Sequence, residues 1–396
     1  MSEWKCYKLN EISSLSNGIN FDKSAYTSGV KLVGVSDFKN RIYPDYDSLL
    51  EVDTKVVKSG DYLEKGDIVF VRSNGNKELV GRCMMIDSDI PVTYSGFCIK
   101  LHLKDKKRFD PVFFNYLFRT RQFKKSMTGT AVGANIQNLS QSRLGNCEVK
   151  VPNIEIQHRI ATILSRYDSL IENYQKQIKL LEEAAQRLYK EWFVDLHFPG
   201  HENTKIVDGV PEGWEKKRLI DLVDVQYGYA FDGKLFNSNK EGTPIVRIRN
   251  IPDGYTSDYT TEEASADYIV KSGDILVGMD GIFHINSWSD RDAYLVQRAC
   301  SFRPKKEEIK GFFFQAIMEP IKFFERTLVG ATVAHLGKKH IDSIDLLYPN
   351  NEKLFVPLQR MFDKRQLALS QIRLLTEARD RLLPKLMSGK IQIKNI

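Results

Sequence analysis

The chain lacks several features that mark particular classes of protein. Its five cysteines are odd in number and include no Cys-x-x-Cys pair, which argues against a disulfide framework or a cysteine-built zinc site and favours a reducing compartment. No run approaches the roughly 18 apolar residues of a membrane span. Residues 1–5 lack the apolar stretch of a signal peptide. These absences predict a cytoplasmic protein, and the length of 396 residues allows two to three domains.

Motifs for catalysis are also scarce. There is no Gly-x-x-x-x-Gly-Lys-Ser/Thr loop for ATP. The run from Asp110 to Phe113 only approaches the motif of amino-methyltransferases and fits a turn that starts a helix better. Asp53-Thr54-Lys55 resembles part of a nuclease site, but the second half of the chain does not repeat it. His197 and His201 are separated by Pro and Gly, so no helix aims them at one metal ion. We therefore expect no active site, metal or cofactor in this chain.

What the sequence does contain is a duplication. Residues 177–188 return as residues 371–382, with eight of the twelve positions identical. Upstream of these segments, further matches pair Trp4 with Trp214, Leu9 with Leu219, Gly18-x-x-Phe21 with Gly228-x-x-Phe231, and Gly66-Asp67-Ile68 with Gly273-Asp274-Ile275. A period near 200 residues is too long for a solenoid repeat and has the size of a domain with an appendage. The chain is therefore predicted to recognise something that also has two parts.

The local sequence pattern alternates along the chain. Residues 1–153 and 213–350 have mixed short strands and turns, with strands expected at 30–35 and 67–71 and a helix at 113–123. Residues 154–194 and 351–390 have a sustained helical period, and the second stretch closes with Pro384 and Ser388-Gly389. Residues 195–212 form a linker and residues 391–396 a tail.

The two helical stretches share one apolar seam with alternating spacings of three and four. Its predicted interface residues are Leu164, Tyr167, Ile171, Tyr174, Ile178, Leu181, Leu188, Leu358, Met361, Ile372, Leu375, Leu382 and Leu386. A heptad held this long is typical of a two-helix coiled coil, although two amphipathic helices packed on separate domains are the alternative. Arg365 and Arg379 interrupt the seam, which leaves Glu residues or a further partner open as their contacts.

The length of this seam suggests a role. Residues 164–192 would span roughly 43 Å at 1.5 Å per residue, and two major-groove half-sites one helical turn apart are separated by about 34–36 Å. A stiff helix pair can therefore hold two globular domains about one turn of DNA apart. If the helices pack antiparallel, a two-fold axis relates the two domains, and both can bind the same duplex in equivalent orientations.

Polar loops at matching places in the two halves are the candidates for reading DNA. Arg, Asn, Gln and Ser can recognise base edges in the major groove, although such loops are also ordinary turns. The candidate residues are Arg72, Ser73, Asn74, Asn76, Lys77, Gln137, Asn138, Ser140, Arg247, Arg249, Asp280, His335, Lys338 and Lys339. The net charge of +7 has the sign that phosphate binding requires, but it is too small to decide the matter.

Four segments carry a resemblance to a known family. They read Ile156-Gln157-x-x-Ile160-Ala161-x-Ile163-Leu164-Ser165-x-x-Asp168-x-x-Ile171-Glu172-Asn173, Leu188-Tyr189-Lys190-x-Trp192-Phe193-Val194-Asp195, Pro211-Glu212-Gly213-Trp214 and Leu383-Pro384-x-Leu386-Met387-Ser388-Gly389-Lys390-Ile391. With these motifs the chain resembles the specificity subunits of type I restriction–modification systems. The second half departs from the pattern, because Phe362 and Leu367 stand where the first half has Asp168 and Asn173.

The resemblance implies an α+β fold with pseudo-two-fold symmetry. Two tandem mixed α/β target recognition domains would be separated by two long helices that form an antiparallel coiled coil. It also implies a non-catalytic subunit that binds double-stranded DNA at a bipartite, asymmetric target. Two modification (methyltransferase) subunits and restriction (translocase and nuclease) subunits would join it, and these partners would use S-adenosylmethionine, ATP and Mg. The alternative function is a coiled-coil scaffold that binds proteins and not DNA.

Overall fold

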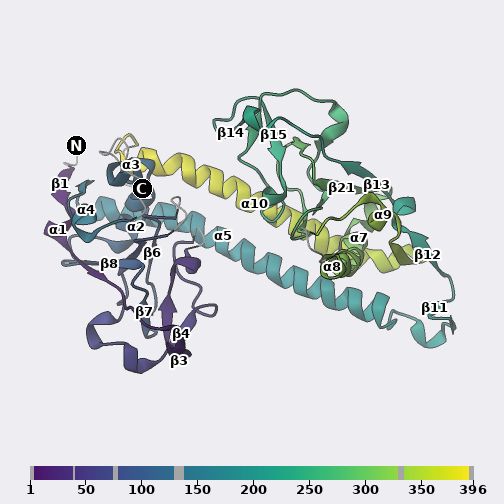
Figure 1. Ribbon diagram of the computed structural model, residues 1–396, viewed down its shortest axis with the longest axis horizontal. Helices are drawn as coiled ribbons and strands as arrows, with labels where there is room; N and C mark the ends of the chain where they lie inside the picture. The colour runs from purple at the N-terminus through teal and green to yellow at the C-terminus, as the bar shows by residue number, and fades with distance from the viewer. Residues whose placement is uncertain (1–3, 39–40, 75–78, 129–137, 329–333, 392–396) are drawn as a thin grey trace. The chain divides into compact units, whose positions relative to one another are not determined.

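The computed structural model describes residues 4–38, 41–74, 79–128, 138–328 and 334–391 (Figure 1). The candidate DNA-reading residues Asn76, Lys77 and Gln137 lie outside these ranges. The chain divides into two compact units, unit 1 with Met1–Ser169 and Thr376–Ile396, and unit 2 with Leu170–Leu375. Each unit contains one β-rich domain and a part of both long helices.

The β-rich domain of unit 1, module 1 (residues 4–153), is built on a four-stranded antiparallel sheet in the order β2-β8-β5-β6. A second sheet has the order β4-β3-β7, with β3 antiparallel to β4 and parallel to β7. The first strand, β1, pairs with the last, β9. The strands are β1 Lys5–Lys8, β2 Ser13–Asn17, β3 Tyr26–Val33, β4 Leu50–Val52, β5 Ile68–Val71, β6 Cys83–Met85, β7 Val92–Tyr94, β8 Cys98–Leu103 and β9 Glu148–Val151. The helices are α1 Leu9–Ile12, α2 Pro111–Arg119, α3 Arg121–Thr128 and α4 Gln141–Gly145.

Module 2 (residues 213–350), in unit 2, repeats this topology with a larger second sheet, in the order β14-β16-β15-β20-β17. Its four-stranded sheet has the order β13-β21-β18-β19, β12 pairs with β22, and the parallel pair β15–β20 repeats β3–β7. The strands are β12 Trp214–Arg218, β13 Val223–Tyr227, β14 Phe236–Asn237, β15 Thr243–Val246, β16 Tyr259–Thr260, β17 Ile269–Val270, β18 Ile275–Gly278, β19 Ile285–Ser287, β20 Ala293–Leu295, β21 Ala299–Pro304 and β22 Asp345–Pro349. The helices are α6 Leu219–Leu222, α7 Lys310–Ala316, α8 Met318–Thr327 and α9 Lys338–Asp342. The predicted tandem of mixed α/β domains is therefore confirmed. The linker forms a hairpin of β10 Ile206–Val207 and β11 Val210–Pro211.

The repeated Gly-Asp-Ile motif forms the turn into the central strand of each module. Gly66 and Gly273 have φ angles of 92° and 93°, a conformation that favours glycine. The buried carboxylates of Asp67 and Asp274 accept the backbone N–H three residues earlier, at 2.8 and 2.9 Å. The motif recurs because both modules make the same turn before a fully buried strand, β5 or β18.

One helix prediction was wrong in detail. Residues 113–123 do not form a single helix, because the extended backbone of Thr120 (ψ 146°) separates α2 from α3. The Thr120 hydroxyl accepts the N–H of Phe123 at 3.2 Å and so satisfies a free donor at the start of α3. The run beginning at Asp110 does start a helix, as expected, because its carboxylate accepts the N–H of Val112 at 2.8 Å.

The two long helices are α5 (Ile154–Tyr189), which a π-helical turn extends over Lys190–Val194, and α10 (Val356–Met387), coloured teal and yellow in Figure 1. In unit 1, Leu164 near the start of α5 shares a hydrophobic core with Leu386 at the end of α10. In unit 2, Ala185 near the end of α5 shares a core with Leu358 at the start of α10. The helices therefore run antiparallel, as predicted. No described helix is both long and apolar enough to cross a membrane.

Both helix ends are anchored on tryptophans that the repeat places at matching positions. In unit 1, the turn after α10 brings Gly389 (φ 69°) against the indole of Trp4, which also lies 6.5 Å from the ring of Phe113. In unit 2, Phe193 in the turn after α5 lies 5.6 Å from the ring of Trp214. Each module is thus fixed to the start of one helix and the end of the other.

Replacing Gly311 by Ala should destabilise unit 2. A Cβ at Gly311 in α7 would lie 2.3 Å from the backbone oxygen of Leu358 in α10, so one helix would have to shift. We expect Gly311→Ala to lower the free energy of unfolding by about 1–3 kcal/mol, the usual cost of overpacking. Chemical denaturation measures this, and Gly233→Ala, where no atom lies within 4 Å, is the control. Equal stability of the two variants would contradict the close approach of α7 and α10.

Candidate nucleic-acid interface

In module 1, three loops that are distant in the sequence meet at the end of β5. Ser73, after β5, forms an isolated antiparallel bridge with Asn138. Next to this bridge, the N–H of Leu139 donates to the oxygen of Arg72 at 2.7 Å. The N–H of Arg72 in turn donates to the oxygen of Phe97, before β8, at 2.8 Å. The loops at 72–74, 97 and 138–140 therefore form one surface.

Module 2 joins the matching loops with the same bonds. Asp280, after β18, forms an isolated antiparallel bridge with His335. The N–H of Leu336 donates to the oxygen of Met279, and the N–H of Met279 donates to the oxygen of Arg298, both at 2.8 Å. The two loops that the repeat places at equivalent positions thus converge in both modules, together with the loop before β8 or β21. We call each set of three loops a loop cluster.

The chemistry of the two loop clusters differs. In module 2 the Asp280 carboxylate accepts from Nδ1 of His335 at 2.5 Å and also pairs with the guanidinium of Arg298. Burial alone would raise the pKa of Asp280, but the hydrogen bonds from His335 and Arg298 outweigh it and lower that pKa. The carboxylate is 16% exposed, whereas the side chains of Arg298 and His335 are 62% and 56% exposed. The largely buried carboxylate of Asp280 thus holds the side chains of Arg298 and His335 at the surface.

Module 1 has uncharged side chains at the bridge. Ser73 is half-buried, Asn138 is exposed, and Phe97 stands 60% exposed where module 2 has Arg298. Arg72 directs a guanidinium nitrogen toward the backbone oxygen of Gly96, at 3.5 Å. The two clusters therefore share a scaffold but present different groups, as expected if each reads a different sequence.

The other candidate residues of module 2 are basic and lie outside its loop cluster. Arg247 and Arg249 flank Ile248, whose side chain faces Gly278 at the end of β18. Arg249 forms a bidentate pair with Asp258 at 2.7 and 3.1 Å, and Arg247 lies over the ring of Phe236. Lys338 pairs with Asp342 at 2.7 Å, and Lys339 is exposed.

In module 1, Ser140 is the N-cap residue of α4. Its hydroxyl accepts the N–H of Arg143 at 3.1 Å and caps α4, which accounts for this residue without DNA. Asn74 is half-buried beside Ser73. The roles of these residues in DNA binding remain predictions.

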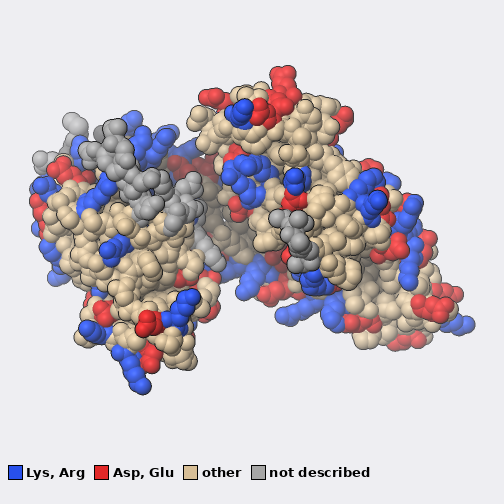
Figure 2. All heavy atoms as spheres, viewed as in Figure 1, with Lys and Arg blue, Asp and Glu red and all other residues tan. Residues whose placement is uncertain are grey.

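Two lysine-rich segments of the sequence, at 104–108 and 305–306, contribute to internal bonds as well as to the surface. Lys104 and Lys106 donate to backbone oxygens of Asn10 and Lys65, and Lys306 pairs with Glu352. On the face drawn in Figure 2, blue and red atoms alternate over both units among the coloured residues. Positive charge is therefore distributed in patches on this face. Among the described residues, no group of three or more His, Cys, Asp or Glu side chains could hold a metal ion.

Sequence reasoning missed Arg298 and Phe97. Both precede the matching strands β21 and β8, and both lend their backbone oxygen to the loop after the central strand. Aligning the strands of the two halves would have put them at one position. The positive φ of Arg298, 70°, gave no sequence signal because it belongs to a residue other than glycine.

The predicted seam residues of the two helices all lie buried or half-buried in the structure. The exposed leucines of these helices are at other positions, namely Leu170, Leu180, Leu367 and Leu374. Burial thus follows the heptad pattern within each unit.

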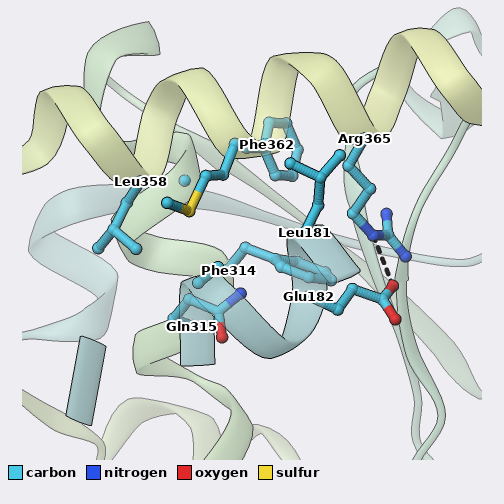
Figure 3. Close-up of a pocket in the computed structure, with 10 residues that line it drawn as sticks. Leu181, Glu182, Phe314, Gln315, Leu358, Phe362 and Arg365 are labelled. Atoms are coloured by element: carbon cyan, nitrogen blue, oxygen red, sulfur yellow. Dashed lines mark hydrogen bonds and ion pairs between the residues drawn. The ribbon is translucent and has the colours of Figure 1, made fainter. Parts of the chain in front are cut away.

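Arg365, which interrupts the seam, is held by α5 and by module 2 (Figure 3). Its Nε donates to Glu182 of α5 at 2.7 Å. Its terminal nitrogens donate to Ser287 and Asn286 of β19, also at 2.7 Å, and its guanidinium lies over the ring of Phe314. The side chain is only 9% exposed. Arg365 therefore links both helices to module 2.

Arg379 has a corresponding role in unit 1. Its guanidinium pairs with Asp168 of α5 at 2.5 Å, and Asp168 also accepts from the hydroxyl of Tyr116 in α2 at 2.5 Å. Burial and the charge of Asp168 raise the pKa of Tyr116, so its hydroxyl stays protonated and donates. Asp168 and Glu182 are fourteen residues apart on α5, as Arg365 and Arg379 are on α10. The seam thus carries one polar link in each unit.

The glutamine at the entry to α5 has a structural explanation. Buried Gln157 accepts the N–H of Asp110 at 2.9 Å and donates to the oxygens of Arg108 and Pro152. The second half lacks this residue at the matching place. In the second half a different glutamine, Gln359 of α10, accepts the N–H of Gly311 at 3.0 Å and joins α10 to α7.

Comparison with known proteins identifies the family. A sequence model described as the type I restriction modification DNA specificity domain matches residues 1–183 and 211–377. These stretches cover most of the chain, so the chain belongs to this family. Its duplicated loop clusters and paired helices are consistent with DNA recognition, and the comparisons give no support to a scaffold that does not bind DNA.

Individual relatives extend over long parts of the chain. The type I restriction enzyme MjaIX specificity subunit of Methanocaldococcus jannaschii is 28% identical over 301 residues, which cover 71% of this chain and 69% of that protein. The HindI specificity subunit of Haemophilus influenzae is 22% identical, with coverage of 99% and 100%. The crystal structure of the S subunit from M. genitalium, at 18% identity, has a TM-score of 0.58 and covers 97% of this chain and 96% of that one, which shows a similar fold.

Removing Arg365 should destabilise unit 2 more than removing its carboxylate partner. Arg365→Ala takes the charged donor from Glu182, Asn286 and Ser287, and bonds with charged groups are worth about 1.5–3 kcal/mol each. We expect a loss of at least about 2 kcal/mol in the free energy of unfolding by chemical denaturation. Glu182→Ala should cost about 1 kcal/mol or less, because Glu182 is 37% exposed.

Exposed Arg360 on the same helix is the matched control, and Arg360→Ala should change stability by less than about 0.5 kcal/mol. If Arg365→Ala behaved like Arg360→Ala, the network around Arg365 would not hold module 2 to the helices.

Proposed function

We propose that this chain is a non-catalytic DNA-recognition subunit that reads a bipartite, asymmetric target with two modules and sets the half-site spacing with its helix pair. The observation that carries the proposal is the pair of loop clusters, formed by the same bonds at Ser73–Asn138 and Asp280–His335 but with different side chains. A common scaffold with divergent loops is what reading two different half-sites requires. This role also agrees with the predicted cytoplasmic location.

The helices suit a spacer because their register is fixed by side chains in each unit. A seam of apolar residues and the links at Arg365 and Arg379 oppose sliding of α5 along α10. Because α5 and its π-helical turn cover residues 154–194, roughly 60 Å at 1.5 Å per residue, this helix is long enough to span one DNA turn of about 34–36 Å.

We further infer that modification subunits dock on the outer faces of the helices. Leu180 and Leu374 occupy matching positions in the repeat and are 64% and 48% exposed. Exposed apolar side chains at two equivalent places suit two copies of one partner. These methyltransferase subunits would supply S-adenosylmethionine chemistry, and restriction subunits would supply ATP- and Mg-dependent translocation and cleavage.

Deleting four residues from α5 tests the spacer role. The deletion removes about one helical turn, roughly 6 Å, so the complex with modification subunits should accept a different spacing and leave both half-site sequences unchanged. Binding to duplexes with the half-sites at a series of spacings measures this. Changed half-site sequences with an unchanged spacing would contradict the proposal. A control of unchanged length replaces four exposed residues of α5 by alanine, namely Glu172, Gln175, Lys176 and Lys179.

Salt dependence tests whether the loop clusters meet DNA phosphates. The logarithm of the binding constant for duplex DNA should fall linearly with the logarithm of the salt concentration. Lys339→Ala removes an exposed charge beside the module 2 cluster and should reduce that slope by about 1. Lys234→Ala, at another exposed site of module 2, is the control. Binding that is insensitive to salt would favour a protein scaffold instead.

A further inference from the structure

We propose that Arg298 reads a guanine in the half-site of module 2, with Asp280 as its positioning residue. This inference rests on the proposed function and extends it to the chemistry of one base. Arg298 lies in the module 2 loop cluster, and none of the sequence motifs includes it.

The backbone at Arg298 has an unusual conformation. Its φ of 70° lies in the left-handed region, which residues other than glycine, Asn and Asp seldom adopt. Arg298 lies in the turn before β21, and its oxygen accepts the N–H of Met279 at 2.8 Å. Such a conformation at a non-glycine residue often marks a functional position. Here it directs a long cationic side chain out of the loop, where 62% of it is exposed.

The Asp280 carboxylate holds the side chain of Arg298 in place. It accepts from one guanidinium nitrogen of Arg298 and, at 2.5 Å, from Nδ1 of His335. Because the carboxylate lies inside the cluster, it restricts the rotamers of both exposed groups before any ligand binds. Side chains held in this way lose less conformational freedom when they bind.

The N–H donors of Arg298 that do not bind Asp280 determine which base this side chain can recognise. A guanidinium has five N–H donors and no acceptor, and Asp280 engages one nitrogen of Arg298. Guanine presents two acceptors, O6 and N7, on its major-groove edge, and arginine binds them as a bidentate pair. Adenine and cytosine each present a donor there, which a guanidinium cannot accept. The exposed donors of Arg298 therefore match guanine best.

Module 1 provides an internal contrast. Phe97 stands at the place of Arg298, and Ser73 and Asn138 take the places of Asp280 and His335. Among the described residues of this cluster, no carboxylate–guanidinium pair forms at the bridge. The contact made by Arg298 should therefore belong to the half-site of module 2.

The test uses the full chain in complex with its modification subunits and a library of duplexes with randomised target bases. The wild-type complex should require a guanine at one position of one half-site. In Arg298→Ala and Arg298→Gly, that single requirement should be lost, with a drop of roughly 5- to 150-fold in discrimination, while the other half-site keeps its preferences. The glycine variant tolerates the positive φ, so its loss cannot come from the backbone. Asp280→Asn should weaken the same requirement and leave the other positions unchanged.

A second measurement replaces that guanine by 7-deazaguanine, which lacks the N7 acceptor. The change should weaken binding by the wild-type complex and leave binding by Arg298→Ala unaltered. Arg218→Ala is the matched control, because Arg218 is 60% exposed and also pairs with an aspartate, Asp221. Base preferences should be unchanged in this control.

Two results would overturn the assignment. One is an Arg298→Ala complex that keeps every base preference, and the other is a uniform loss of affinity for all sequences, which would indicate a phosphate contact. A wild-type complex without any sequence preference would overturn the proposed function as well.

Discussion

The antiparallel packing of α5 against α10 is the interaction on which the rest of the structure depends. Each β-rich module rests on the start of one helix and the end of the other, so neither module is held by a single connection. Fully burying an apolar seam residue such as Leu164 or Leu358 contributes on the order of 1.5–3 kcal/mol, before the entropy of ordering the chain is subtracted. Buried links at Arg365 and Arg379 add directional bonds that fix the register. A change in the part of the helix pair that belongs to one unit would therefore reach the module of that unit.

The duplicated modules keep the residues that build the scaffold and differ in those that face outward. Gly66 and Gly273 make the same turn, and the backbone bonds of the loop clusters recur in both modules. At the surface, Phe97 and Arg298 occupy one structural position and have unrelated chemistry. Family membership explains the shared scaffold, and a target with two different parts would explain the divergence.

The sequence predicted the scaffold well because its signals are local or periodic. Heptad spacing located both long helices, and the repeat located the two modules. The break at Thr120 escaped prediction because the apolar pattern continues through it. The extended backbone of Thr120 and its hydroxyl contact to Phe123 show that a new helix begins. A glutamate was foreseen as a possible contact of an interrupting arginine, and Glu182 is that contact for Arg365.

The site was less predictable because its contacts join distant parts of the chain. The ion pair of Arg298 with Asp280 spans 18 residues, and the bond of His335 to Asp280 spans 55. No local pattern encodes such pairs. The bonds of Arg365 to Asn286 and Ser287 likewise depend on how β19 meets α10.

Mapping modified adenines in a genome tests the central claim most directly, in cells that carry this chain with its modification subunits and in cells that lack only this chain. The account predicts modified adenines within two short defined sequences separated by a gap of fixed length and free composition, and their loss when the chain is absent. One uninterrupted recognition sequence, or modification that persists without the chain, would contradict it.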